Sequence, residues 1–247
     1  LGDDLLRRSV RSEAGASWRT INAVDEYHLT GLAHGAAGIA LALAELFQAT
    51  NDARYRVAAD LAFAYERHWF DATQGNWPDL REAAARNATP RHALAFSTYW
   101  CHGAPGIGLS RLRAYDILHD PRLRMDAAIA LGTTRRMIEA SLPLPSGSVN
   151  FSLCHGLAGN ADVLLLGAQL LPEVCAGAAE LAAQVGATGS SRHSGTDCDW
   201  PSGAPGGISP SLMLGLAGIG HFYLRLHDPS LPSVLLPRGQ MTTPAHP

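Results

Sequence analysis

The chain has 247 residues, of which 47% are hydrophobic and 17% are charged, a balance typical of a globular protein and not of a disordered one. Its formal net charge of −3 gives no reason to expect nucleic-acid binding, which requires a basic surface. All 19 positive charges are arginines, which excludes the chemistry of a Schiff-base lysine or a phosphate-loop lysine.

Apolar runs and cysteines indicate the compartment. No signal peptide is visible and no apolar run reaches membrane-spanning length, so we expect a cytoplasmic protein without membrane insertion. Four cysteines in a chain of this length do not form a disulfide scaffold. In a reducing compartment they are candidates for metal binding or catalysis.

In chain order, the first predicted element is an amphipathic helix over Leu1–Val10. The first residues already read as the middle of a helix, so we expect the sequence to be a piece of a longer protein. Asn51 and Asp52 can cap a second helix that runs to about Trp69. The inner side of that helix is predicted to carry Tyr55, Ala59, Ala62 and Tyr65.

Further helices are predicted to begin at Asp120-Pro121 and at Pro172, the latter running through Val185. The stretch Thr188–Ser209 is rich in Gly, Ser and Pro and is predicted to be a loop. No run alternates β-branched residues, so we predict an all-α fold. We expect one domain over residues 1–237, followed by a loose polar tail over 238–247.

A short pattern, Gly-x-x-Gly followed by an apolar helical stretch, occurs four times. Successive copies begin 68, 53 and 59 positions apart, a period that fits one helix pair with its connections. Glycine at these positions permits close backbone approach and positive φ at a tight turn into a helix. The copies are Gly35–Gly38, Gly103–Gly106, Gly156–Gly159 and Gly215–Gly218.

The two residues that precede each copy include candidate metal ligands when the four copies are aligned. These pairs are Ala33-His34, Cys101-His102, Cys154-His155 and Met213-Leu214. Two cysteines and a histidine are a known ligand set for catalytic zinc, which keeps an open position, so Cys101, Cys154 and His155 are the candidate metal ligands. If the repeats close around an axis, these turns converge at one end, and we expect the three donor atoms to lie within about 4 Å of one another.

Each candidate also has a plainer interpretation. Cys101 and Cys154 could be small buried hydrophobes. His34 could be a general acid or base, a further ligand, or a structural histidine, and His102 is expected beside the site but not as a ligand. Asp79 and Arg81 either shape a substrate-facing loop or form a solvated turn. Cys175 is predicted in the core, Cys198 in an exposed loop, and Glu66 and Arg67 as ordinary helix charges.

These motifs resemble the signatures of the LanC-like lanthionine cyclases. The resemblance covers about Trp18 to Leu236, and Gly75–Arg81 is similar to the cyclase domain of class II (LanM-type) synthetases, in which a dehydratase domain precedes the cyclase. The segments that carry it are Gly31–Ile39, Trp100–Ile107, Leu153–Asn160 and Leu212–Gly220, with Asp228-Pro229 and Pro232–Leu235 after them.

The resemblance implies an α/α toroid of inner and outer helices, a zinc ion held by Cys101, Cys154 and His155, and a catalytic role for His34 near the zinc. The family's toroid has seven helix pairs and this chain shows about four, so we expect the C-terminal part of a longer synthetase. Its implied partners are a dehydrated precursor peptide, the missing N-terminal repeats and a dehydratase domain.

The implied reaction is the addition of a peptide cysteine thiolate, formed at the zinc, to the β-carbon of dehydroalanine or dehydrobutyrine. His34 would protonate the α-carbon, and the product is lanthionine or methyllanthionine. Three alternatives stay open: a zinc-thiolate alkylating enzyme such as a prenyltransferase, a non-catalytic module that binds thiols such as glutathione, and an inactive fragment. The first receives little support from an aromatic content of 7%.

Overall fold

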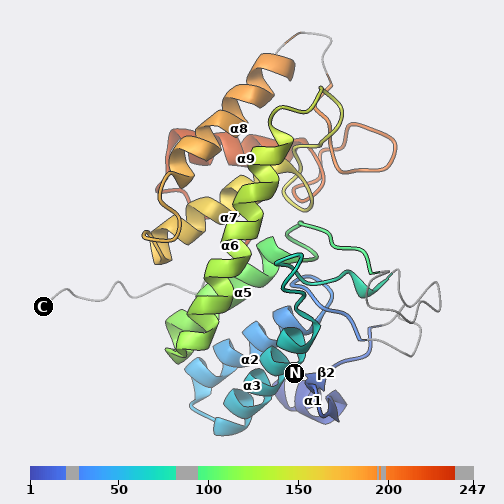
Figure 1. Cartoon of the computed structure of the whole chain (residues 1–247), viewed down its shortest axis with the longest axis vertical. Coiled ribbons are helices and arrows are strands. Elements are labelled where there is room, and N and C mark those ends of the chain that lie inside the picture. The colour runs from blue at the N-terminus through green and yellow to red at the C-terminus, as the bar shows by residue number, and fades with distance from the viewer. Residues whose placement is uncertain (21–27, 82–93, 194, 196–198, 237–247) are drawn as a thin grey trace, which may run out of the picture.

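The computed structural model describes residues 1–20, 28–81, 94–193, 195 and 199–236. Figure 1 shows its helices and one small hairpin. The elements are α1 (Gly2–Arg8), β1 (Val10–Ser12), β2 (Gly15–Ser17), α2 (Ala36–Thr50), α3 (Ala53–Trp69), α5 (Ala104–Leu118), α6 (Pro121–Ser141), α7 (Leu157–Leu170), α8 (Ala178–His193) and α9 (Leu216–His227). The predicted tail over 238–247, like Cys198, lies outside these residues.

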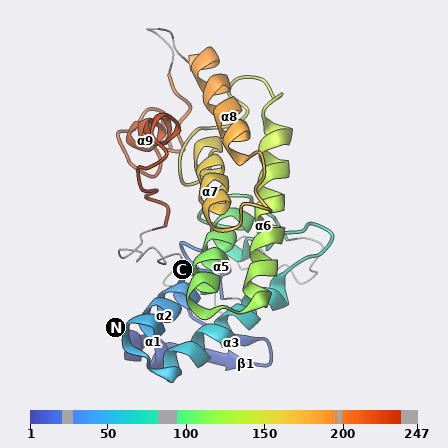
Figure 2. The same ribbon diagram turned by 90° about the vertical axis from the view of Figure 1, so that its left-hand side faces the viewer.

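The architecture is an incomplete all-α toroid. Helices α2 and α3, α5 and α6, and α7 and α8 pack as consecutive pairs, and α2, α5, α7 and α9 follow one another as neighbours. Figures 1 and 2 show α2 and α3 at one end of the molecule, α8 and α9 toward the other, and α7 between them beside α5 and α6. In the part of the chain that is described, the toroid therefore comprises three pairs and the inner helix of a fourth.

The Gly-x-x-Gly turns start the inner helices, as predicted. Each of α2, α5, α7 and α9 begins directly after the first glycine of its motif. The second glycine lies against the carbonyl oxygen of the residue six positions earlier, where a Cβ would approach to 2.1 Å in the first copy and 1.9 Å in the others. No larger side chain fits this recurring contact, which explains why the motif repeats.

Side-chain caps determine where the outer helices α3 and α6 begin. Asp52 accepts a hydrogen bond from the Arg54 amide at 2.9 Å, and Asp120 accepts one from the Arg122 amide at 2.9 Å, so both predicted helix starts are confirmed. The first predicted helix is confirmed too, although it ends at Arg8 and a short antiparallel hairpin of β1 and β2 follows it.

The boundaries of α8 were predicted wrongly. It begins at Ala178, after Gly177 at φ +74°, and not at Pro172. It also continues to His193, so the first part of the predicted Thr188–Ser209 loop is helical. The helix persists through Gly and Ser because its last turn is packed: His193 is buried with its ring 5.8 Å from Phe151. Tertiary packing here overrides weak helix propensity.

Two apolar clusters make up most of the core. One lies among α2, α3, β2, the end of α5 and the start of α6, and the other among α5 to α9 with the chain that follows α9. Tyr55, Ala59, Ala62 and Tyr65 are all buried, as the helical register predicted. None of the helices in the described ranges has the length and apolar character that a bilayer crossing requires.

Candidate metal centre

A chain of backbone hydrogen bonds joins the turns that precede the inner helices. The Ala33 amide donates to the Cys101 carbonyl at 3.3 Å, the Cys101 amide to the Cys154 carbonyl at 3.4 Å, and the Cys154 amide to the Met213 carbonyl at 2.9 Å. These are the residues that the alignment of the four motif copies had made equivalent. The same pairing recurs from unit to unit, and it brings all four turns to one end of the toroid.

This pairing sets two cysteines and a histidine side by side. The Sγ atoms of Cys101 and Cys154 and a ring nitrogen of His155 all lie within 4.8 Å of one another, a slightly wider spacing than the sequence predicted. Cys101 is buried, whereas Cys154 and His155 are half-buried, so the cluster is open on one side. It is the only such group of three or more candidate ligands among the described residues.

The two neighbouring thiols shift each other's pKa in opposite directions. The hydrogen bond from Cys154, opposed by burial and aided by His155, lowers the pKa of Cys101 from 9.0 to about 4. The same hydrogen bond, together with burial, raises the pKa of Cys154. The Cys101 thiolate in turn raises the pKa of His155 through its hydrogen bond to the ring. This pairing favours ionisation of the Cys101 thiol, and the thiolate is the form in which cysteine binds metals.

The ring of His155, a candidate metal ligand, is oriented by a residue that the sequence did not reveal. Its Nε2 lies 3.2 Å from the carbonyl oxygen of Gly203. When Nε2 donates this bond, the neutral ring leaves the lone pair of Nδ1 for a metal, an arrangement common in metal sites. A Cβ on residue 203 would lie 2.4 Å from Nε2, so this approach requires glycine. Two sulfurs and one oriented imidazole fit the donor chemistry of zinc.

His34 reaches the same end of the toroid through a ring stack. Its ring lies 5.1 Å from that of His102, centroid to centroid, at an interplanar angle of 14°. His102 directly follows Cys101 and is buried, with Nε2 lacking a hydrogen-bond partner, while His34 is exposed. The stack therefore sets the exposed ring of His34 against the residue that directly follows Cys101 in the chain.

Asp79 and Arg81 lie behind this stack and do not form a merely solvated turn. Asp79 is buried and its Oδ1 lies 3.9 Å from Nδ1 of His102. Burial is the largest single influence on Asp79 and acts to raise its pKa, but hydrogen bonds from Arg81, two of them at 2.9 and 2.5 Å, together with the charges of His102 and Arg81, lower that pKa overall. The charge of Arg81 also lowers the pKa of Cys154, so the guanidinium favours thiolate at the cluster.

Asn76 fixes the turn that carries Cys101. Its Nδ2 donates to the Ser97 carbonyl at 3.1 Å, and its Oδ1 accepts from the Ala104 amide at 2.9 Å, where α5 begins. The Gly75–Arg81 segment thus clamps both sides of the Cys101 turn. The segment resembles part of a class II synthetase, but no local pattern in the sequence predicts this role for Asn76.

Glu66 was predicted wrongly as an ordinary helix charge. It is fully buried, and its Oε1 accepts a hydrogen bond from the Gly31 amide at 3.1 Å, which anchors the turn that ends in His34. Burial, which outweighs the opposing charge of Arg111, raises its pKa to about 7. Arg67 was misjudged in the same way, since it pairs with Asp126 at 2.7 Å, and Asp126 also contacts the fully buried Arg111.

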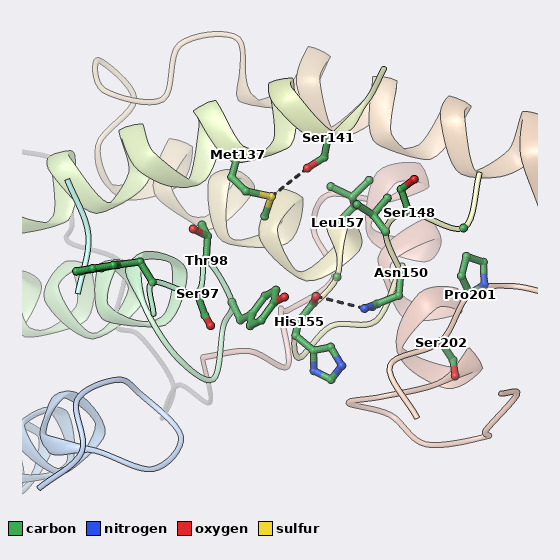
Figure 3. A pocket seen from close by; sticks show the side chains of 15 residues that line it. Ser97, Thr98, Met137, Ser141, Ser148, Asn150, His155, Leu157, Pro201 and Ser202 are labelled. Carbon is green, nitrogen blue, oxygen red and sulfur yellow. Dashed lines mark hydrogen bonds between the residues drawn. The ribbon is translucent and has the colours of Figure 1, made fainter. Parts of the chain in front are cut away.

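A cavity of about 550 Å³ adjoins the cluster (Figure 3). His155 lines it, and Figure 3 shows Ser97 and Thr98 on one side with Pro201 and Ser202 on the other. Cys175, by contrast, is buried in the apolar core as predicted and lies outside the cluster.

Comparisons with known proteins agree with these features. A family model described as "Lanthionine synthetase C-like protein" matches residues 2–236. "Nisin biosynthesis protein NisC" of Lactococcus lactis subsp. lactis is 27% identical over 146 residues, which cover 57% of this chain and 33% of that protein. The solved structure of "Nisin cyclase" superposes with a TM-score of 0.54 and 19% identity over 82% of this chain and 47% of that one. The chain thus spans about a third of the curated relative and about half of the solved structure it matches.

Proposed function

We propose, from the premise that the chain belongs to the lanthionine synthetase C-like family, that it is the C-terminal part of a zinc-dependent cyclase domain. Its reaction adds the thiols of peptide cysteines to dehydroalanine or dehydrobutyrine in a lanthipeptide precursor. The observation that carries the proposal is the convergence of Cys101, Cys154 and His155 on hydrogen-bonded turns. The likeness of Gly75–Arg81 to class II synthetases favours a LanM-type parent with a dehydratase domain.

Cys101, Cys154 and His155 would hold the metal, with Gly203 fixing the histidine ring. With zinc bound, the site would offer a Lewis acid that deprotonates a substrate thiol whose pKa is roughly 8.5 in water. Arg81 is held by Asp79 near the cluster, and its charge favours the anionic sulfurs. The partly open side of the cluster leaves the substrate thiol access.

His34 would deliver the proton that completes the reaction. The substrate thiolate forms a C–S bond at the β-carbon, and the electron pair of the C=C bond moves toward the α-carbon and its carbonyl. A protonated ring nitrogen of His34 then donates its proton to the α-carbon, and the proton that the substrate thiol released returns His34 to its protonated form. His34 suits this role because it is exposed and its ring is held by the stack on His102.

Two substitutions in the full-length parent synthetase test these roles. Cys154→Ala is expected to lose both zinc and ring formation, since two remaining ligands hold zinc poorly. His34→Ala is expected to keep one zinc per chain and to slow ring formation by about 10²–10⁴-fold, the usual contribution of a general acid. Zinc is measured by elemental analysis and ring formation by mass spectrometry after thiol alkylation.

His227→Ala, an exposed substitution at the end of α9, is the matched control and should change neither readout. Loss of zinc from His34→Ala would make His34 a ligand. Unchanged ring formation in that variant would remove it from the mechanism, and a zinc-replete Cys154→Ala protein would contradict the ligand set.

A further inference from the structure

The cavity beside His155 is built from five separate segments that meet at the cluster. They are the strand-like stretch before Cys101, the end of α6, the loop after α6, the turn that contains His155, and the loop that supplies Gly203. His155 belongs to both the cavity wall and the candidate ligand set. A peptide whose cysteine reaches the metal therefore has its neighbouring residues beside this cavity.

The lining carries no formal charge among the described residues, apart from the titratable His155. Its polar groups are the hydroxyls of Ser97, Thr98, Tyr99, Ser141, Ser148 and Ser202 and the amide of Asn150. Its apolar surface comes from Phe96, Met137, Val149, Leu157 and Pro201. Hydroxyl and amide groups can pair with a peptide backbone, while the apolar surface accepts small or aliphatic side chains. A charged side chain would lose its hydration here without gaining an ionic partner.

The walls are fixed before any ligand arrives. The Thr98 carbonyl accepts a hydrogen bond from Asn160 at 2.9 Å, and the Ser97 carbonyl accepts one from Asn76 at 3.1 Å. On the opposite side, the Pro201 carbonyl accepts one from the Phe151 amide at 2.8 Å. Because both walls are tied to buried residues, the cavity is preformed, and its volume of about 550 Å³ suits a few peptide residues.

We propose that this cavity binds the uncharged segment that flanks the cyclising cysteine of the substrate, and that it selects against acidic and basic residues there. The inference rests on the proposed function, because the metal at His155 fixes where the substrate cysteine lies. It adds a specificity that the family assignment does not contain: the residues next to the reacting cysteine are small, aliphatic or hydroxylated.

Fluorescein-labelled heptapeptides with a central cysteine test the proposal without requiring chemistry. One peptide carries Ser and Leu beside the cysteine, a second carries Asp there, a third carries Arg, and a fourth has Ser and Leu flanks with the cysteine replaced by serine. Binding to the zinc-loaded chain is measured by fluorescence anisotropy. We expect the neutral peptide to bind at least about tenfold more tightly than the Asp or Arg peptide, as uncompensated burial of a charge requires.

Two tryptophan substitutions test whether the preference for neutral peptides arises in this cavity. Ser148 is exposed and lines the mouth of the cavity, so Ser148→Trp should abolish the preference without disturbing the core. Ser146→Trp lies in the same exposed loop but outside the lining, and it should leave the preference intact. Equal binding of neutral and charged peptides, or an unchanged preference in Ser148→Trp, overturns the proposal.

The fourth peptide separates the two hypotheses. If zinc is not bound but the serine peptide still binds more tightly than the Asp and Arg peptides, and Ser148→Trp removes that difference, the cavity inference stands and the proposed function fails. If zinc binds and the parent forms rings, yet no preference is found, the cavity inference alone fails.

Discussion

Replacing Glu66 by glutamine tests whether a buried carboxyl group under the His34 turn is held at a raised pKa. The carboxyl is fully buried on α3, where Oε1 accepts from the Gly31 amide and Oε2 has no hydrogen-bond partner. Glutamine keeps an oxygen that can accept from Gly31 but cannot ionise. The variant therefore removes the charge and preserves the anchor.

The size of the expected change in the free energy of unfolding follows from the pKa of Glu66. Burial raises the pKa of Glu66 from 4.5 to about 7, and burial also lowers the pKa of its neighbour Arg111, so desolvation outweighs attraction on both partners. The difference for Glu66 corresponds to roughly 3 kcal/mol. Because the folded pKa is the higher one, this contribution is complete below pH 4.5 and is lost as the pH rises through 7.

Urea unfolding of the full chain at several pH values between 4 and 8 measures the effect. The free energy of unfolding of Glu66→Gln minus that of the wild type should rise with pH by up to roughly 3 kcal/mol, with most of the change between pH 4.5 and 7. Glu13→Gln, on the exposed β-hairpin, is the control and should track the wild type. Parallel curves for Glu66→Gln and the wild type would refute the raised pKa.

Two further outcomes follow from the motif turns and the cluster. Gly106→Ala would place a Cβ 1.9 Å from the Trp100 carbonyl oxygen and should destabilise the chain by about 3 kcal/mol or more. The control Gly220→Ala, whose Cβ would have nothing within 4 Å, should be neutral or stabilising. Similar urea midpoints for the two variants would contradict the steric account. Zinc at about 100 times its Kd should stabilise the chain by about 2.7 kcal/mol and show two sulfurs near 2.3 Å by X-ray absorption, and Cys101→Ser should lose both effects. Purely N/O coordination in the wild type would exclude the predicted ligand set.

The repeat pattern was predictable because its causes are local. Each motif glycine contacts a carbonyl only six positions away, and Asp52 and Asp120 cap helices that begin at the next residue. Glu66 could also have been found: it lies four residues after Ala62 on the buried stripe of α3, and a carboxyl group in that register signals a buried partner. Gly203 gave no such signal, since its contact with His155 spans 48 positions and depends on tertiary packing.

The hydrogen-bonded turns also indicate which neighbouring units hold the candidate metal ligands in place. In a toroid built of repeating units, each unit is held chiefly by its neighbours. Cys101 and Cys154 lie on consecutive units and pair directly, and the Met213 carbonyl of the next unit holds Cys154 from its other side. The backbone contacts that join the candidate ligand turns among the described residues therefore come from neighbouring repeat units of this chain. We accordingly expect the chain to bind zinc on its own, at the stoichiometry of one ion that Cys101, Cys154 and His155 can hold.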